Sequence, residues 1–394
     1  MKRQTKFALL FSLAYFISYI TRINFGAVIS EMVSATGFSK DLLSLSVTGS
    51  FVTYGVGQLI SGVLGDKISP KNLVLYGLII TVLMNMAIPF CTSPYTMMAV
   101  WCVNGFAQSL MWPPIVKLMT LMFSNEVYKK VCEKVILASS FATIMVYLVS
   151  PVLIAISGWK TVFFFSAILG LIMILVWQKY CLNLKPKRVE RNTTSKSNIS
   201  VFFCPAMLCV MVAIICVGML RDGITTWMPT YISETYNLKN EISILTGVLL
   251  PLFSVFSINM ATKLYTKKLK NPVFCGGVLF LAGAFSAVLM VVTTGKNAIF
   301  SVVSAALITG CMHGVNLMLI CMIPAFFKKF DFVSTGSGVI NFCTYIGSAI
   351  STYGIAILSQ KSGWGFTLKL WVLIAVLGTL LCFIASKPWK KQFM

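Results

Sequence analysis

Three charged side chains lie inside long apolar stretches of the sequence, where a charge is costly to place. Arg22 falls in the stretch 7–29, and Arg221 and Asp222 fall in the stretch 201–224. An arginine at the centre of a membrane helix costs about 2.5–3.5 kcal/mol on insertion scales, so such residues usually face a watery cavity or a partner. A guanidinium stays charged and binds carboxylate or phosphate oxygens in pairs. Two arginines that meet in one cavity would therefore bind an organic anion.

Two simpler explanations compete with an anion site. The arginines can extend to the membrane surface, or Asp222 can neutralise Arg221. We consider the second arrangement unfavourable, because adjacent residues on a helix point about 100° apart. Arg22 has no acidic residue within its own stretch. A structure in which Arg22 and Arg221 point apart, into lipid or sealed against acidic partners, would remove the case for anion transport.

Aromatic and imidazole side chains accompany the arginines. Tyr15, Tyr19 and Arg22 follow i, i+4, i+7 spacing, so they share one helix face. Two phenol rings beside a guanidinium suit an oxyanion with polar groups, although ordinary packing is the alternative. His313 is the only histidine, and Gly310 and a second glycine beside it permit close helix approach. A structural role, a proton relay and a substrate hydrogen bond all remain open for it.

Composition places these residues in a membrane protein. Of the 394 residues, 58% are hydrophobic and 11% are charged, and the mean hydropathy is +0.88. Soluble domains are about half apolar and a quarter charged. A membrane span needs roughly 20 mostly apolar residues. We therefore expect an all-α membrane fold, with the basic start of the chain belonging to the first span rather than to a signal peptide. The expected spans are 7–29, 43–64, 72–91, 95–118, 134–156, 160–180, 201–224, 241–262, 272–293, 297–324, 333–358 and 366–385.

The positive charge of the chain follows this topology. Most lysines and arginines fall in the termini and in loops on one side, whereas the acidic residues divide nearly evenly. By the positive-inside rule, both termini are expected in the cytoplasm and the protein in the cell membrane. The same pattern explains the net charge of +22 without a nucleic-acid partner. The polar stretch 181–200 is expected to be a cytoplasmic linker between an N-terminal bundle (1–180) and a C-terminal bundle (201–394) of six helices each.

An internal repeat indicates that the two bundles are related. Ser157-Gly158-Trp159 recurs as Ser362-Gly363-Trp364, and Asn104-Gly105 meets Thr309-Gly310 at the same offset of 205 residues. Six plus six helices related by an axis along the membrane normal is a known plan for transporters, with the substrate site near the midplane between the halves. The two buried arginines then occupy equivalent helices, the first and the seventh.

The turn after the second span carries a recognisable signature. It reads Gly62-Val-Leu-Gly65-Asp66-Lys67-Ile-Ser69-Pro70-Lys71 and follows the pattern GxxxD(R/K)xxx(R/K). In this it resembles the major facilitator superfamily, which implies twelve helices in two pseudo-symmetric bundles that rock around a central site. The glycines permit tight packing, and Asp66 beside Lys67 at a helix end can latch neighbouring helices. The candidate gating residues are Gly62, Asp66, Lys67 and Lys71.

Four further segments share a narrower likeness. They are Tyr19-Ile-Thr-Arg22-Ile-Asn24-Phe25, Asn104-Gly105-Phe-Ala-Gln108-Ser-Leu-Met-Trp112-Pro113-Pro114, Leu220-Arg221-Asp222-Gly223-Ile-Thr-Thr-Trp227-Met-Pro229-Thr230-Tyr231, and Gly338 to Tyr345. They resemble the organophosphate:phosphate antiporter family, the carriers of glycerol 3-phosphate and hexose phosphates. The resemblance implies that two arginines clamp a phosphoryl group within an aromatic cavity. The substrate-binding residues that we expect are Arg22, Arg221, Tyr15, Tyr19, His313, Tyr345, Gln58 and Trp112, with Asp222 as a candidate for ion coupling.

The chain also departs from that family. Gln58 and Ile23 stand where glycerol-phosphate carriers have lysines, and His313 stands where they have a tyrosine. The fifth span lacks the binding histidine of those carriers. The expected site is therefore less positive, and it suits a monoanion, a carboxylate or an organophosphate.

These observations predict a secondary transporter that exchanges an organophosphate for inorganic phosphate. One alternative is a proton- or sodium-coupled symporter of a carboxylate such as a sugar acid, with Asp222 as the titrating group. Another is an anion sensor that does not transport. The sequence offers no nucleophile–base set, paired catalytic carboxylates or metal cluster, so we expect neither an enzyme nor a cofactor. We expect a monomer in the lipid bilayer, with twelve free thiols because the cysteines lack regular spacing.

Overall fold

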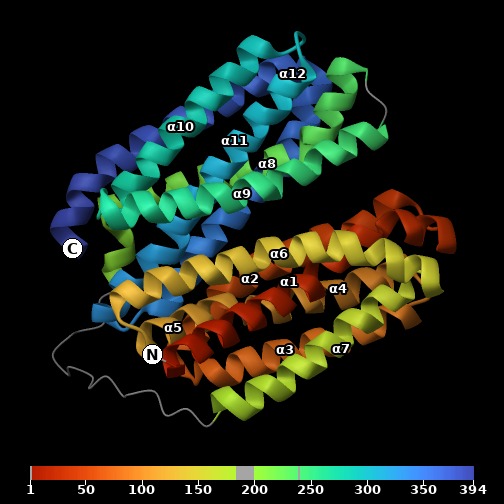
Figure 1. Ribbon diagram of the computed structural model, residues 1–394, viewed down its shortest axis with the longest axis horizontal. Helices are drawn as coiled ribbons and strands as arrows, with labels where there is room; N and C mark the ends of the chain where they lie inside the picture. Colours follow the sequence, from red (N-terminus) through yellow and green to blue (C-terminus); the bar gives the residue numbers. More distant parts are fainter. Residues whose placement is uncertain (1, 183–198, 238–239) are drawn as a thin grey trace. The chain divides into compact units, whose positions relative to one another are not determined.

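The structure is a computed structural model that describes residues 2–182, 199–237 and 240–394. Throughout these ranges the chain is helical apart from short connections, and no strand occurs in them. The chain forms two compact units (Figure 1). Unit 1 comprises Met1–Lys196 and Phe327–Phe342, and unit 2 comprises Ser197–Phe326 and Cys343–Met394. The predicted linker falls mostly on 183–198, outside the described residues.

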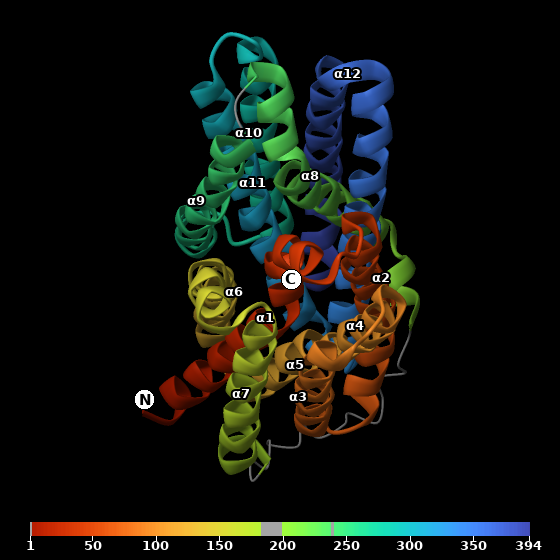
Figure 2. The same cartoon turned by 90° about the vertical axis from the view of Figure 1, so that its right-hand side faces the viewer.

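Unit 1 is built from long helices that pack along one another. Within it, α1 packs against α6 and α7, and α2 packs against α4 (Figures 1 and 2). The elements are α1 (Lys2–Thr36), α2 (Lys40–Lys67), α3 (Pro70–Ala87), η1 (Ile88–Phe90), α4 (Pro94–Ser109), α5 (Trp112–Met122), α6 (Asn125–Ser157), α7 (Lys160–Trp177) and η2 (Gln178–Leu182), with the start of α12 (Val333–Phe393).

Unit 2 repeats this arrangement of packed helices. In it, α11 packs against α8, α9 and α10. Several helices of both units begin at a proline, whose fixed φ and missing N–H suit the first helical position. The elements are η3 (Ile199–Phe203), α8 (Pro205–Tyr236), α9 (Asn240–Lys267), α10 (Pro272–Thr293), α11 (Ala298–Asn316), η4 (Leu317–Met322), the first half of η5 (Ile323–Phe330), whose second half from Phe327 belongs to unit 1, and the rest of α12.

The expected spans are present as helices. Among the described residues, ten helical segments are long and apolar enough to cross a membrane. The fourth span is divided into α4 and α5, because Pro113 and Pro114 lack the N–H groups that a continuous helix needs there. Together with α9, this pair completes twelve crossing segments in two bundles of six. Several helices extend beyond the predicted apolar cores; α1, for example, runs from Lys2 to Thr36.

The internal repeat is visible in the backbone. Gly158 ends α6 with φ 74° and ψ 178°, and Gly363 divides α12 with φ 74° and ψ 171°. Only glycine adopts this region of φ and ψ readily. The glycines of the two Ser-Gly-Trp triplets therefore make the same turn at equivalent places in the two halves.

The outer surface of the helices is apolar. Leu148, Ile156, Phe256, Phe285 and Ile299 each expose more than two thirds of their surface. A soluble protein would not leave so many large apolar side chains uncovered, whereas lipid is their natural solvent. All twelve cysteines are free, as their irregular spacing predicted.

Candidate functional site

The guanidinium of Arg22 lies between two tyrosine rings of unit 1. Its central carbon is 4.2 Å from the ring centroid of Tyr19 on the same helix and 4.7 Å from that of Tyr54 on α2. Tyr15 packs against Tyr19 at 5.0 Å between ring centroids. Arg22 is only 8% exposed. Tyr15, Tyr19 and Arg22 thus form the continuous face that their spacing predicted, and Tyr54 extends it onto a second helix.

A layer of buried polar side chains fixes α1 in position. Gln108 of α4 accepts a hydrogen bond from Ser18 at 2.5 Å and donates one to Thr21 at 2.9 Å. Asn85 of α3 donates to the Thr21 carbonyl at 3.0 Å and accepts from Asn24 at 2.8 Å. Each of these groups is buried, where a hydrogen bond is costly to lose. The layer sets the rotation of α1, and with it the direction of the Arg22 face.

Trp112 and Gln58 extend this face of unit 1. The Trp112 ring packs on Tyr15 at 4.9 Å between centroids and is 1% exposed. Gln58 lies one turn after Tyr54 on α2, is fully buried, and accepts a hydrogen bond from Asn341 at 3.3 Å. The indole N–H of Trp112 and the amide N of Gln58 have no hydrogen-bond partner within the described residues. Both are donors suited to an anion.

Arg221 of unit 2 is paired with the acidic residue beside it. Its Nε donates to Asp222 Oδ1 at 2.7 Å and a terminal nitrogen donates to Oδ2 at 2.9 Å, while the other terminal nitrogen donates to Asn316 at 2.9 Å. The expectation that this pair is unfavourable was wrong. The Cβ atoms of neighbouring residues diverge, but the flexible arginine side chain carries its guanidinium back to the carboxylate. Asp222 also accepts a hydrogen bond from Ser348.

His313 and Tyr345 lie in the same unit as this pair. His313 is partly buried on α11, one turn before Asn316, and its imidazole interacts electrostatically with Arg221 and Asp222. Tyr345 is partly buried on α12, one turn before Ser348. Unit 2 thus brings His313, Arg221 and Asp222 together. The meeting of Arg221 with Arg22 in one cavity stays a prediction.

The gating motif forms contacts within unit 1. Asp66 pairs with Lys117 of α5 at 2.9 Å, and its carboxylate oxygens accept the backbone N–H groups of Ser334 at 3.1 Å and Thr335 at 2.7 Å. These N–H groups belong to the first turn of α12, which favours a negative charge. Lys117, rather than the adjacent Lys67, is therefore the ion-pair partner of Asp66.

The two glycines of the motif allow α2 to approach α12 closely. A Cβ on Gly62 would lie 2.9 Å from the Ser334 carbonyl oxygen and 3.1 Å from the Gly338 Cα, and one on Gly65 would overlap the Ser334 hydroxyl. Lys71 lies at the start of α3, where its carbonyl accepts a hydrogen bond from Trp177 at 3.1 Å. Its role in gating stays a prediction.

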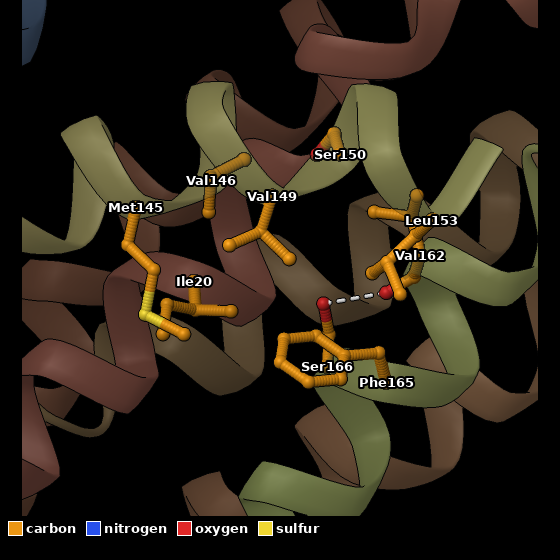
Figure 3. Close-up of a pocket in the computed structure, with 9 residues that line it drawn as sticks. All are labelled: Ile20, Met145, Val146, Val149, Ser150, Leu153, Val162, Phe165 and Ser166. Carbon is orange, nitrogen blue, oxygen red and sulfur yellow. Dashed lines mark hydrogen bonds between the residues drawn. The ribbon is translucent and has the colours of Figure 1, made fainter. Parts of the chain in front are cut away.

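A small cavity between α1, α6 and α7 has a different character. It is lined by Ile20 of α1, by Met145, Val146, Val149, Ser150 and Leu153 of α6, and by Val162, Phe165 and Ser166 of α7 (Figure 3). Ser166 donates its hydroxyl to the Val162 carbonyl at 2.8 Å. None of the predicted binding residues lines this cavity, and its lining carries no charge to hold an anion.

Four polar residues that contact the predicted site residues were not predicted from the sequence. Tyr54 and Asn341 belong to unit 1, and Asn316 and Ser348 belong to unit 2. Tyr54 precedes Gln58 by four residues and Asn316 follows His313 by three, so helical spacing from a candidate residue was an available signal. Asn341 and Ser348 meet their partners across 283 and 126 residues of sequence, so no local pattern marks them.

Comparisons with known proteins agree with this architecture. The profile of the Major Facilitator Superfamily matches residues 11–352. The E. coli fucose:proton symporter FucP has the same fold, with a TM-score of 0.75 and 13% identity over 96% of this chain and 98% of that chain.

Curated relatives share most of their length with this chain. The glycerol-3-phosphate transporter of Bacillus subtilis is 26% identical over 88% of this chain and 84% of its own length. The probable hexose phosphate transport protein of Chlamydia muridarum is 22% identical over 94% of this chain and 88% of its own length. The membrane sensor protein UhpC of Salmonella typhimurium is also 22% identical, over 89% of this chain and 84% of its own length. They confirm the resemblance to organophosphate:phosphate antiporters, and the chain belongs to the major facilitator superfamily, a family of membrane transporters rather than enzymes.

Proposed function

We propose that the protein carries a phosphorylated small metabolite across the cell membrane in exchange for inorganic phosphate, by alternating access around one site. The observation that carries this proposal is Arg22, a buried cation with tyrosine rings on its guanidinium. A guanidinium stays charged and its planar fork binds two oxygens of a phosphoryl group. A buried arginine packed against aromatic rings is therefore suited to a phosphorylated substrate.

The relatives support the choice of anion. Two of them are named for glycerol 3-phosphate and hexose phosphate. A phosphate ester carries about −1.5 to −2 charges near neutral pH, and the two arginines of the equivalent helices α1 and α8 match that charge. Without an anion, Asp222 is paired with Arg221, and the arginines and Asp222 together keep a net positive charge, which is costly to enclose in a low-dielectric site. A bound anion would offset that charge, so the two halves change conformation only when substrate is bound, and obligatory exchange follows.

The orientation in the membrane is part of the proposal. The excess of lysine and arginine in the termini and on one side of the loops supports cytoplasmic termini. We propose that the carrier acts as a monomer, since each monomer contains both arginine-bearing helices.

The test is uptake into liposomes that contain the purified protein and are preloaded with phosphate. Labelled glycerol 3-phosphate or a hexose phosphate should enter only when phosphate is inside. Arg22→Lys and Arg221→Lys should abolish uptake, because lysine lacks the planar fork that binds two oxygens. Arg191→Lys, in the predicted linker, is the matched control and should retain it. Uptake of the ester that ignores internal phosphate would contradict exchange.

The same liposomes separate the two competing functions. A carboxylate symporter is favoured by the Arg221–Asp222 pair, which offers a carboxylate that can take up a proton. It would accumulate a labelled sugar acid in response to a pH gradient, with no need for internal phosphate. An anion sensor is favoured by the relative named as a membrane sensor. It would bind the ester with measurable affinity and yet produce no flux.

A further inference from the structure

The Arg221 guanidinium already holds a carboxylate in the position that a substrate anion would need. Nε and one terminal nitrogen form the paired hydrogen bonds to Asp222 that an arginine fork makes to any carboxylate or phosphate. The second terminal nitrogen is held by Asn316. A substrate anion can bind the edge formed by Nε and the first of these terminal nitrogens only by taking the place of Asp222.

The surroundings of Asp222 provide for its protonation. The Ser348 hydroxyl lies within hydrogen-bonding distance of both Asp222 Oδ2 and the Thr344 carbonyl, which is 3.0 Å away. A serine hydroxyl rotates and can donate or accept. When Asp222 is ionised, Ser348 donates to it. When Asp222 is protonated, the carboxyl can donate to Ser348, whose own proton then turns to Thr344.

Among the residues that the structure describes, two charged or titratable groups act on this carboxylate. They are Arg221 on its own helix and His313 on α11, and α12 contributes the uncharged Ser348. Among the residues of α9 whose side chains the structure describes, the charged ones are Lys263 and Lys267 in its last turns. Asp222 and Arg221 keep 31% and 16% of their side chains exposed, so a solute and a proton can reach them.

We propose that Asp222 is an exchangeable counter-anion of Arg221: a substrate anion displaces it from the guanidinium, and the displaced carboxylate takes up one proton. This inference rests on the proposed function and names the ion that accompanies the substrate. The proton comes from the surrounding water and forms an O–H bond on the carboxylate, and no other covalent bond forms or breaks. On release of the substrate, Asp222 loses that proton and returns to Arg221.

The charge balance explains why a proton is needed. Arg22, Arg221 and ionised Asp222 together carry one positive charge, which matches a monoanion. Protonation of Asp222 raises the sum to two, which matches the dianion of a phosphate ester. An ionised Asp222 left beside that dianion would repel it strongly, because like charges interact strongly away from bulk water.

The experiment measures ligand binding and proton uptake together, with the purified protein in weakly buffered detergent solution at pH 8.5. At this pH a phosphate ester is already a dianion, since its second pKa is about 6, so any proton taken up belongs to the protein. We expect glycerol 3-phosphate to bind with uptake of about one proton per ligand. In Asp222→Asn, we expect roughly tenfold tighter binding at pH 8.5 and no proton uptake, because no competing carboxylate remains. The matched control is Glu234→Gln, which alters a carboxylate of the same helix that binds Trp364 and should behave as wild type.

Several outcomes are decisive. If Asp222→Asn does not fold, Asp222→Ser removes the same titrating group and should give the same result. Binding of the ester by the wild type without proton uptake, together with an unchanged affinity in the variant, would overturn the inference and leave the proposed function standing. Binding of gluconate with proton uptake, but no binding of the ester or of inorganic phosphate, would overturn the proposed substrate and keep the role of Asp222. Failure to bind any of the three anions between pH 5.5 and 8.5 would overturn both.

Discussion

The carboxylate of Asp66 lies 2.9 Å from the Lys117 ammonium, and both side chains are about nine-tenths enclosed. The pair joins the end of α2 to α5, and the same carboxylate accepts two N–H groups from the first turn of α12. All three elements belong to unit 1 at these residues. One carboxylate therefore connects three helices, which is the latch that the sequence motif suggested, with a different cation as its partner.

Replacing Asp66 by asparagine should destabilise the protein. The change leaves the Lys117 charge enclosed without its counter-ion, and breaking a buried ion pair costs about 3–5 kcal/mol. Thermal unfolding in detergent, followed by tryptophan fluorescence, should show a lower midpoint. Lys117→Met should also lower it, and the double variant should lose less than the sum of the two, because both singles break one interaction. Additive losses would show that the two residues act separately.

Adding a methyl group to Gly338 should disturb the crossing of α2 and α12. A Cβ there would overlap the Gln58 carbonyl oxygen and lie 3.0 Å from the Gly62 Cα. Both neighbours are backbone, so Gly338→Ala should cost about 1–3 kcal/mol, as overpacking does. The control is Gly354→Ala on the same helix, where a Cβ meets nothing within 4 Å. A lowered unfolding midpoint for both variants would point to a general helix effect rather than to the crossing.

The contribution of the Tyr54 ring to anion binding at Arg22 can be tested without removing any charge. Tyr54→Phe keeps the aromatic face at 4.7 Å from the guanidinium and should bind glycerol 3-phosphate nearly as the wild type does. Tyr54→Leu removes that face, and the loss of a cation–π contact of about 0.5–2 kcal/mol should weaken binding roughly 2- to 30-fold. Equilibrium binding of the labelled ester measures both. Equal affinities for the two variants would show that the ring does not position Arg22.

The fold could be predicted to a large extent because the bilayer constrains it. Apolar length alone marked the helices, and the Ser-Gly-Trp triplets marked the repeat whose glycines share one conformation. The helix ends were less predictable, because α1 (Lys2–Thr36) and α8 (Pro205–Tyr236) continue through polar residues beyond their apolar cores. The break between α4 and α5 follows from Pro113 and Pro114, whereas apolar length alone predicts one continuous span there.

The candidate site was predictable in residue type and less so in its partners. The face of Tyr15, Tyr19 and Arg22 followed from helical spacing. The Arg221–Asp222 pair did not, because the directions of neighbouring Cβ atoms do not limit how far a long arginine side chain can reach. Ser348 and Asn316 reach this pair from other helices, and only the folded packing brings them there.

The proposed function requires Arg22 and Arg221 to bind the same anion, and a double-mutant cycle on ligand binding measures whether they do. Labelled glycerol 3-phosphate would be titrated against wild type, Arg22→Lys, Arg221→Lys and the double variant. A hydrogen bond to a charged group contributes about 1.5–3 kcal/mol, so each single variant should bind about 10- to 150-fold more weakly. If both arginines hold one phosphoryl group, the double variant should bind less than about tenfold more weakly than either single, because the first loss already breaks the clamp. A shared site would be contradicted if the fold-loss of affinity in the double variant equalled the product of the two single losses. Wild-type affinity in either single variant would also contradict it.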